Sequence, residues 1–257
     1  MLKKIVIIGA GNVASHLGLA LKKSGYNISQ VYSRHIANAE CLSSLVDAVA
    51  IDDLSKITVD ADIYIISVSD GVVEAVANSM PMVEGIVVHT AGSIEMSVLD
   101  RFSLHGVLYP FQTFTKQKEL DFYQVPLLVK GNVSFSNNTL LELAESISCN
   151  VQQASDSKRK ALHISAVFAC NFVNHLYALS DELLEKEGLN FSLLAPLIKE
   201  TTQKALSMKP LYAQTGPAIR GDQAVINSHL KALKMDSFYH DIYLLLSDSI
   251  AKLPNDK

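Results

Sequence analysis

Residues 3–34 read KKIVIIGAGNVASHLGLALKKSGYNISQVYSR, and this stretch decides the fold. Its apolar run at 5–8 is continuous, which is typical of a parallel strand that is covered on both faces. Glycines then interrupt the run, and apolar residues return at helical spacing before Gly25, where a left-handed helix end is expected. A second strand closes the stretch. We therefore expect strand, glycine turn, helix and strand, the first half of a dinucleotide-binding unit.

The glycine turn has the spacing Gly-x-Gly-x-x-Ala, from Gly9 to Ala14. Gly9 permits the tight turn, Gly11 lets the backbone approach a pyrophosphate, and the small Ala14 lets the helix pack close to the strand. The free amides at the start of the helix, together with the helix dipole, attract an anion. We expect Gly9, Gly11, Asn12 and Val13 to contact the cofactor. The alternative is a tight turn in an ordinary α/β domain.

The end of the second strand indicates which dinucleotide is bound. Sites for NAD usually place Asp or Glu about 20 residues beyond the glycines, where the carboxylate binds the ribose hydroxyls. No acidic residue lies between Asn12 and Ala39, and the strand ends at Ser33 and Arg34. A hydroxyl and a guanidinium suit a 2′-phosphate. The sequence therefore favours NADP over NAD, unless Arg34 is simply a solvated surface residue.

Composition limits the classes of protein to which the chain can belong. With 257 residues, 49% of them apolar, it is long enough for one large or two modest domains, and its net charge of -4 argues against a nucleic-acid partner. We see no signal sequence and no apolar run near the ~20 residues that span a bilayer. We therefore expect a cytoplasmic protein with no membrane partner. The three cysteines lack the spacing of metal ligands, so no metal site is expected.

Two further apolar strands, at 63–68 and 86–89, end in small polar residues. In parallel sheets ligands bind beyond the carboxyl ends of the strands, so these residues should lie along the cofactor. They are Ser67, Val68, Ser69, Thr90, Ala91 and Gly92. Asp70 follows the first group; we expect it to cap a helix, as Asp often does at such a turn, and the alternative is a catalytic acid.

The alternation of strands and helices continues to about residue 154. The segment 106–114 contributes a strand that ends near Tyr109, and further strands are expected at 126–130 and near 151, with a helix at 138–147. This pattern indicates an α/β Rossmann fold with a doubly wound, mostly parallel sheet. From 156 to 187 the chain has neither Gly nor Pro and reads as one long helix, and further helices are expected at 191–208, 223–229 and 237–253. The sequence thus predicts an NADP-binding domain at 1–154 and an all-helical domain for substrate and dimerisation at 155–257, with a frayed tail at 254–257.

One polar stripe runs along the expected helix that begins at Asp156. At ~100° per residue, Lys160, His163, Asn171 and Asn174 share one side, while most of the circumference is apolar. Such a helix is expected to be buried and central, with its polar groups facing a cavity or hydrogen-bond partners. Hydride transfer to a C=O or C=N carbon needs a proton donor at the heteroatom. We expect His163, Lys160 and Asn171 to be catalytic; the alternative is an exposed edge, or amides that satisfy neighbouring loops.

Two more segments supply candidate residues. Tyr109 lies at the end of an expected strand and is a second proton-donor candidate. The segment TGPAIRGD at 215–222 breaks the helical pattern, and its Arg220 could clamp a carboxylate or phosphate with two hydrogen bonds. An ion pair between Arg220 and Asp222 that holds the loop is the alternative. We expect Arg220 to bind the substrate together with Ser93 and Asn174.

These motifs resemble those of a family of NADP-dependent oxidoreductases in which a Rossmann domain is joined to a helical domain of unassigned function. The likeness covers nearly the whole chain and rests on the glycine turn, on YPFQTF at 109–114, on His163 with Asn171, and on TGPAIRGD at 215–222 with His229. More distantly, AGSI at 91–94 and KALH at 160–163 resemble segments of the superfamily of pyrroline-carboxylate reductases, β-hydroxyacid dehydrogenases and 6-phosphogluconate dehydrogenases. The resemblance implies a helical domain that dimerises and borders the nicotinamide.

The sequence therefore predicts an NADP(H)-dependent oxidoreductase that transfers hydride to or from a C=O or C=N carbon of a small polar, anionic substrate. The alternative is a non-catalytic NADP(H)-binding sensor or scaffold, against which the polar stripe argues. A methyltransferase would need an acid at the end of the second strand. A homodimer is expected, supported by bulky apolar residues on the last helix, unless this face packs inside one chain: Phe238, Tyr239, Ile242, Tyr243 and Leu246.

Overall fold

The structure is a computed structural model that describes residues 3–253. The chain divides into two compact units, residues 1–167 and residues 168–257. The first unit holds the sheet, and the described part of the second is helical. The functional division predicted between residues 154 and 155 stays a prediction. The expected fraying of residues 254–257 falls outside the described residues.

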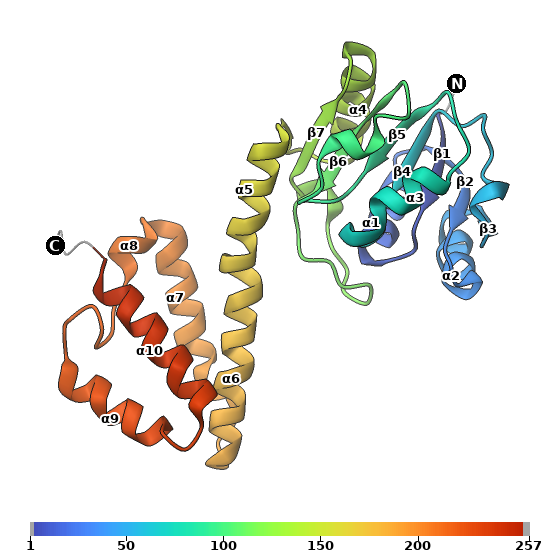
Figure 1. The fold of residues 1–257 in the computed structure, drawn as a ribbon. Helices are drawn as coiled ribbons and strands as arrows, with labels where there is room; N and C mark the ends of the chain where they lie inside the picture. Colours follow the sequence, from blue (N-terminus) through green and yellow to red (C-terminus); the bar gives the residue numbers. More distant parts are fainter. Residues whose placement is uncertain (1–2, 254–257) are drawn as a thin grey trace. The chain divides into compact units, whose positions relative to one another are not determined.

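The first unit is built on one eight-stranded sheet (Figure 1). Its strands follow the order β3-β2-β1-β4-β5-β6-β7-β8, and all neighbours pair in parallel except β6 and β7. The order reverses between β1 and β4, because the chain runs from β1 to β3 on one side and continues from β4 on the other. The predicted doubly wound, mostly parallel sheet is confirmed. The strands are β1 (Lys4–Ile8), β2 (Asn27–Tyr32), β3 (Val49–Ile51), β4 (Ile63–Ile66), β5 (Ile86–His89), β6 (His105–Pro110), β7 (Leu127–Gly131) and β8 (Val151–Gln153).

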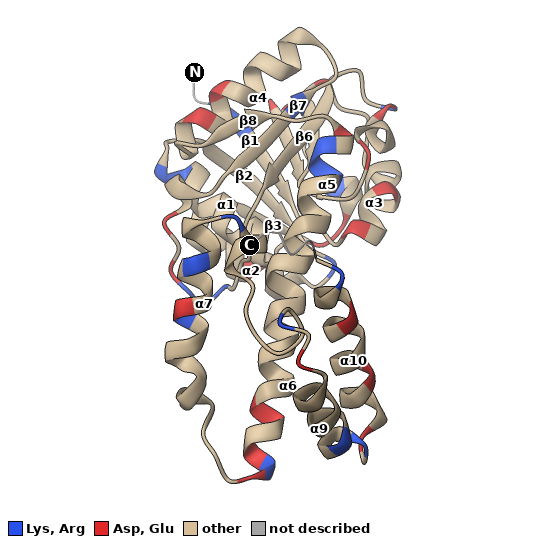
Figure 2. Ribbon diagram, turned by 90° about the vertical axis from the view of Figure 1, so that its left-hand side faces the viewer, with Lys and Arg blue, Asp and Glu red and all other residues tan. Residues whose placement is uncertain are grey.

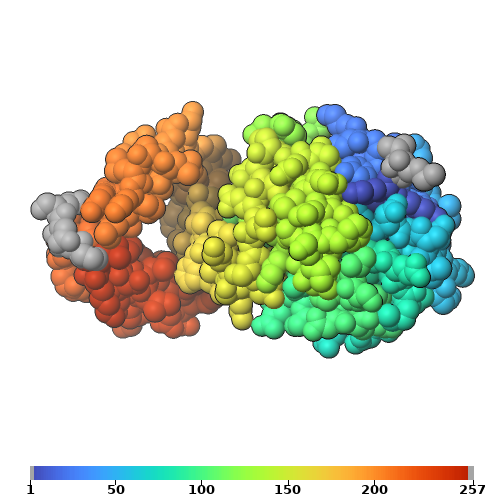
Figure 3. All heavy atoms as spheres, turned by 90° about the horizontal axis from the view of Figure 1, so that it is seen from above, coloured from blue at the N-terminus to red at the C-terminus, as the bar shows by residue number. Residues whose placement is uncertain are grey.

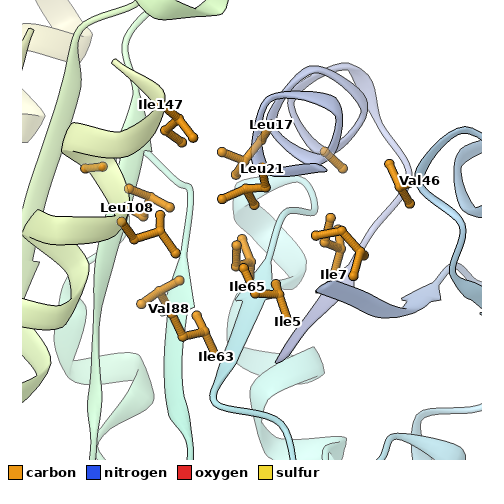
Figure 4. Packing of buried hydrophobic residues seen from close by; sticks show 14 of the residues in the cluster. Ile5, Ile7, Leu17, Leu21, Val46, Ile63, Ile65, Val88, Leu108 and Ile147 are labelled. Atoms are coloured by element: carbon orange, nitrogen blue, oxygen red, sulfur yellow. The ribbon is translucent and has the colours of Figure 1, made fainter. Parts of the chain in front are cut away.

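Apolar clusters cover both faces of this sheet, because successive side chains of a strand point to opposite faces. Ile5 and Ile7 of β1 pack in one cluster with Leu17 (Figure 4), while the alternate residues of β1 pack in the other. The first cluster includes residues of α1 (Asn12–Lys23), α2 (Ile36–Val46) and α4 (Ser134–Ile147), and the second includes residues of α3 (Val73–Ser79). The atoms of this unit, coloured blue to yellow-green in Figure 3, form one continuous body.

The ends of the helices follow local chemistry. Gly25 has a φ of 87°, the left-handed conformation expected after α1. Helix α4 begins at Ser134, earlier than the predicted start at residue 138, because the Ser136 hydroxyl accepts a hydrogen bond from the Val133 amide at 3.2 Å. Polar residues that suggest a loop in the sequence therefore form the first turn of a helix.

The second unit contains only helices and turns in its described residues, as predicted. Gly188 has a φ of 68° and follows the helix that it was expected to end. Helix α7 contacts α8, and α9 contacts α10. The helices are α6 (Val173–Lys186), α7 (Ala195–Ser207), α8 (Pro210–Ala213), α9 (Gln223–Leu233) and α10 (Ser237–Ala251), with a short 3₁₀ segment at Phe191–Leu194.

One helical run, Asp156–Lys186, belongs partly to each unit. It consists of α5 (Asp156–Ala166), a π-helical segment (Val167–Phe172) and α6. Hydrogen bonds in a π-helix join residues five apart instead of four, so a projection at one fixed angle per residue fails across this segment. The prediction of a single straight polar stripe is therefore wrong. Lys160 and His163 precede the π-helical segment, whereas Asn171 lies within it and Asn174 after it.

The same helical run is exposed, so the prediction of a buried central helix is also wrong. In its most apolar 18-residue window the mean hydropathy is 1.2 and 6% of the window is buried. By length and composition alone, it is the one helix of the described chain that could cross a membrane. No charged Lys, Arg, Asp or Glu lies between Lys160 and Asp181, as the uncoloured middle of this helix shows in Figure 2. The sequence reveals which sides of a helix are apolar but not whether the same chain covers them.

Candidate functional site

A cavity of about 920 Å³ lies at the edge of the sheet in the first unit. Its lining comes from the residues that follow β1, β2, β4 and β5, and from the end of β6. These are the carboxyl ends of parallel strands, and the strand order reverses between β1 and β4. The cavity therefore occupies the place where doubly wound sheets bind nucleotides.

The two glycines of the turn have different environments. Gly9 has a φ of 124°, and a Cβ atom there would lie 2.0 Å from the carbonyl oxygen of Ser67. Its amide donates a hydrogen bond to the carbonyl of Tyr32 at 2.8 Å. A Cβ atom on Gly11 would have no neighbour within 4 Å, and Gly11 precedes α1 without a side-chain cap. The open space and the uncapped amides at the start of α1 fit a pyrophosphate group.

The Asn12 side chain has a structural partner next to this turn. Its Nδ2 donates to the carbonyl oxygen of Phe114 at 2.9 Å, and His16 Nε2 lies 3.0 Å from the carbonyl oxygen of Thr115. The segment after β6 is therefore held beside the glycine turn, and its Gln112 and Lys116 line the cavity. Sequence reasoning missed both residues, because no local pattern reports that a loop about 100 residues away returns to α1. Val13, predicted with Asn12, also lines the cavity.

The far end of the cavity carries the residues predicted to select NADP. Ser33 and Arg34 line it together with two residues that the sequence reading left unassigned, His35 and Asn38. The Ser33 Oγ atom accepts a hydrogen bond from the His35 amide at 3.4 Å, and Arg34 is exposed. No carboxylate from β2 or α2 lines the cavity in the described residues. This end of the cavity therefore presents hydrogen-bond donors and positive charge.

The loops after β4 and β5 meet in the middle of the cavity. Thr90 Oγ1 donates a hydrogen bond to Ser67 Oγ at 3.1 Å, and Val68, Ser69 and Gly92 also contribute to the lining. Ala91 differs, because it is buried in the apolar cluster and its amide donates to His89 Nδ1 at 3.2 Å. Ser93 is exposed and lies outside the lining. The predicted contacts of Ala91 and Ser93 with ligands stay predictions.

Asp70 does not cap a helix, so the capping prediction is wrong. It is the first residue of a short 3₁₀ segment, Asp70–Val72, and Val72 precedes α3. No hydrogen bond to its carboxylate occurs among the described residues, and Asp70 lines the cavity. Because of the 3₁₀ turn, Val72 and not Asp70 occupies the position before α3. The negative charge of Asp70 instead acts on the tyrosine described next.

Tyr109 and His163 form a hydrogen-bonded pair that lines the cavity. Tyr109 Oη and His163 Nδ1 are 2.9 Å apart, and the two rings meet edge to face. Burial, reinforced by the charge of Asp70, raises the pKa of the Tyr109 phenol to about 12, so it keeps its proton at neutral pH. Gly92 packs against both rings: a Cβ atom there would lie 2.5 Å from His163 Nδ1 and 2.8 Å from Tyr109 Cζ. The two predicted proton donors, Tyr109 and His163, therefore form one hydrogen-bonded pair.

Other predicted residues lie outside this cavity. Lys160 is exposed on α5 and does not contribute to the lining. Asn171, Asn174 and Arg220 belong to the second unit and are exposed, and their roles stay predictions. Within the described residues Arg220 forms no ion pair with Asp222, whose carboxylate instead accepts a hydrogen bond from the Val225 amide at 3.3 Å and caps α9. The alternative reading of Arg220 and Asp222 as a loop-holding pair is therefore wrong.

The fold and this cavity define a Rossmann-type nucleotide-binding protein. Residues 2–111 match the Rossmann-like domain, and residues 125–250 match the domain of unknown function DUF2520. A crystal structure called "putative NADP oxidoreductase" from Bacteroides fragilis is 41% identical, covers 98% of both chains and has a TM-score of 0.90. The chain therefore belongs to the same family as this protein, in which a Rossmann-like domain is followed by DUF2520. None of the curated proteins matches the chain.

Two more distant structures share the fold. A reductive aminase from Aspergillus terreus in complex with NADPH and ethyl-5-oxohexanoate is 14% identical over 97% of this chain and 93% of its own, with a TM-score of 0.72. A pyrroline-5-carboxylate reductase from Coxiella burnetii is 13% identical over 98% of this chain and 100% of its own, with a TM-score of 0.55. The predicted distant resemblance to pyrroline-carboxylate reductases is confirmed at the level of the fold.

Alanine at each glycine of the turn separates their two roles. Gly11→Ala should keep the free energy of unfolding within ~0.5 kcal/mol, since the methyl group meets no atom, but weaken NADPH binding at least about tenfold by filling the space before α1. Gly9→Ala should lower the free energy of unfolding by about 2 kcal/mol or more, because of its φ and the contact with Ser67. Urea unfolding and titration of NADPH fluorescence measure both quantities. Unchanged NADPH affinity in Gly11→Ala would place the pyrophosphate elsewhere.

Proposed function

We propose that the protein is an NADP(H)-dependent oxidoreductase that transfers hydride to or from a C=O or C=N carbon of a small polar, anionic substrate. The observation that carries this proposal is the Tyr109–His163 pair, which lines the same cavity as the glycine turn. A nucleotide-binding protein without catalytic activity has no need for a hydrogen-bonded pair of proton donors at this place. Bound NADPH supplies the hydride.

The arrangement of the cavity supports NADP(H) as the cofactor. The glycine turn and the uncapped start of α1 would hold the pyrophosphate, with Lys116 beside them. Ser33 and Arg34 would bind the 2′-phosphate, where a carboxylate would repel it. Ser67 and Thr90 would lie along the nicotinamide half, at the ends of the central strands.

The proton comes from the pair of rings. Reduction adds one hydride to the carbon and one proton to the oxygen or nitrogen of the substrate. Because its pKa is raised to about 12, Tyr109 holds the proton at Oη until the heteroatom takes it. His163 Nδ1, at 2.9 Å, can then return a proton to Oη. In the direction of oxidation the relay runs in reverse: Oη passes its own proton to His163 Nδ1 as it accepts the proton that leaves the substrate.

The charges in the cavity favour an anionic substrate. Arg34 and Lys116 line it, against the single carboxylate of Asp70. A negative group is therefore attracted to this edge of the sheet. From the second unit we propose that Asn171, Asn174 and Arg220 orient the substrate, as the sequence predicts. Lys160 remains a weaker catalytic candidate because it lies outside the lining.

We further propose a homodimer formed through the helical region. The resemblance to enzymes with dimerising helical domains supports it, and so does the bare apolar middle of the long helix, where Phe168 is 65% and Phe172 49% exposed. The predicted face of α10 supports it in part: Phe238 is 53% and Leu246 41% exposed, whereas Tyr239 is 7% exposed and its hydroxyl donates a hydrogen bond to Glu182 within the second unit. We expect the dimer contact mainly along the helical run.

We also propose a cytoplasmic location. Cys41, Cys149 and Cys170 are free thiols, and all three are exposed. Free exposed thiols persist in reducing compartments, whereas oxidising compartments convert them to disulfides. Fractionation of cells that express the protein tests this location.

The cofactor assignment predicts a loss of NADPH affinity in Arg34→Gln. One charge-assisted hydrogen bond to a phosphate is worth about 1.5–3 kcal/mol, so the Kd for NADPH should rise about 10- to 100-fold while that for NADH stays the same. Fluorescence titration of both nucleotides measures this. Lys3→Gln is the matched control, because it removes one charge at the opposite end of β1. Equal losses for NADPH and NADH in Arg34→Gln would disprove a 2′-phosphate site at this residue.

The catalytic assignment predicts that Tyr109→Phe and His163→Asn each lower kcat about 10²-fold or more, since both remove the transferable proton. NADPH affinity should change less than about twofold. Transfer of deuterium from 4-deuterated NADPH to a panel of small oxo and imino acids, read by mass spectrometry, identifies the substrate and measures the rate. Tyr123→Phe is the control, because Tyr123 is exposed and lies outside this cavity. Tight NADPH binding without transfer to any compound would favour the sensor.

The homodimer proposal predicts a solution mass of twice the chain mass of 28.0 kDa at micromolar concentration. Phe168→Glu should shift the protein toward the monomer, because it places a charge in the apolar contact. Light scattering measures both masses. Leu19→Glu on α1, where the leucine is also exposed, should leave the dimer intact. A monomeric wild-type protein would remove the proposal.

A further inference from the structure

Arg159 is the largest fully buried side chain of the protein, with an exposed fraction of 1%. A buried guanidinium destabilises a fold unless its donors are paired, and a well-packed apolar residue of similar volume is often at least as stabilising. Stability alone therefore does not explain an arginine here. Arg159 lies on α5 four residues before His163, so the two side chains share one face of the helix.

The bonds of Arg159 join α5 to the segment between β5 and the next 3₁₀ turn. Its Nη1 donates to Asp156 Oδ1 at 2.8 Å, and its Nη2 donates to the carbonyl oxygen of Ile94. The other carboxylate oxygen of Asp156 accepts a hydrogen bond from the Met96 amide at 3.1 Å. The ion pair is thus hydrogen-bonded to the backbone at 94–96: Arg159 binds the carbonyl of Ile94, and Asp156 binds the amide of Met96.

The same segment forms the wall against which the catalytic rings rest. Gly92 lies two residues before Ile94, and a Cβ atom at Gly92 would come within 2.8 Å of both the Tyr109 and His163 rings. At its other end the segment is fixed by the bond from the Ala91 amide to His89 Nδ1. Burial, and next the charge of Arg159, lower the pKa of His89 to about 4, so His89 stays neutral and keeps Nδ1 free to accept.

We propose that Arg159 is a positioning residue that sets the hydrogen bond between Tyr109 and His163. Arg159 anchors α5 to residues 94–96. His163, which contacts Tyr109 and Gly92, lies one helical turn further along α5. The proposal rests on the proposed function only for the use of the pair in catalysis. The contact that it explains is a property of the folded protein without any ligand.

The test reads the imidazole of His163 directly by ¹⁵N NMR. The signal is assigned by its loss in His163→Asn, and Tyr109→Phe gives its position when the hydrogen bond is absent. Arg159→Met replaces the guanidinium by an apolar side chain of similar length. We expect it to move the His163 signals to those of Tyr109→Phe, with the Kd for NADPH changed less than about twofold. Arg159→Lys, which keeps the charge but replaces the planar guanidinium by a single ammonium group, should give an intermediate shift.

Arg101→Met is the matched control. Arg101 also donates to backbone carbonyl oxygens of the first unit, at Ala77 and Asn78, but it does not touch the segment beside Gly92. Arg101→Met should lower the melting temperature without moving the His163 signals. Unchanged His163 signals in Arg159→Met, or equal movement in Arg101→Met at a matched loss of stability, would overturn the proposal.

Asp156→Asn keeps the test decisive if Arg159→Met does not fold. The amide weakens the hydrogen bonds of residue 156 to both Arg159 and Met96, so the His163 signals should move in the same direction as in Arg159→Met. No movement of these signals overturns the proposal. Once a substrate is known, kcat in Arg159→Met should fall at least about tenfold with the KM for NADPH unchanged. If the wild type reduces nothing, the proposed function fails, but the NMR result still decides the role of Arg159.

Discussion

The backbone of Gly9 passes so close to the carbonyl of Ser67 that a side chain at this position would lie 2.0 Å from the oxygen. This approach ties the turn after β1 to the end of β4, and the Gly9 amide binds the carbonyl of Tyr32 on the other side. The ends of three neighbouring strands are therefore held together at the point where strand order reverses. No side chain larger than a hydrogen atom fits at Gly9, so the turn after β1 lies against the end of β4 at the edge of the sheet where the cavity is.

The reacting end of the cavity depends on a second close approach, that of Gly92 to the rings of Tyr109 and His163. The family domain DUF2520 includes His163, yet this residue belongs to the same compact unit as the glycine turn. Short bonds from α5 to the loop after β5 fix it there. The Tyr109–His163 pair and the glycine turn are consequently parts of one body, and the role that we propose for the helical unit concerns the substrate and the dimer.

Much of the architecture could be predicted because it depends on short-range patterns. The continuous apolar strands, the turn spacing and the left-handed Gly25 and Gly188 all report local backbone requirements, and the structure has them. The errors occurred where a local pattern has more than one outcome. A 3₁₀ turn took Asp70 away from the helix start, a π-helical segment broke the polar stripe, and an apolar helix was left uncovered.

The sequence by itself determined the glycine turn, the absence of an acid near Ser33 and Arg34, and the chemical types of the candidate donors. These are properties of residues adjacent in the chain. Only the tertiary structure decided that Tyr109 bonds to His163, 54 residues away, and that Arg159 reaches Ile94, 65 residues away. Such contacts form only when the sheet has folded and α5 packs beside it, and the periodicity of the sequence does not predict them. Tertiary packing therefore turned two separate donor candidates into one pair.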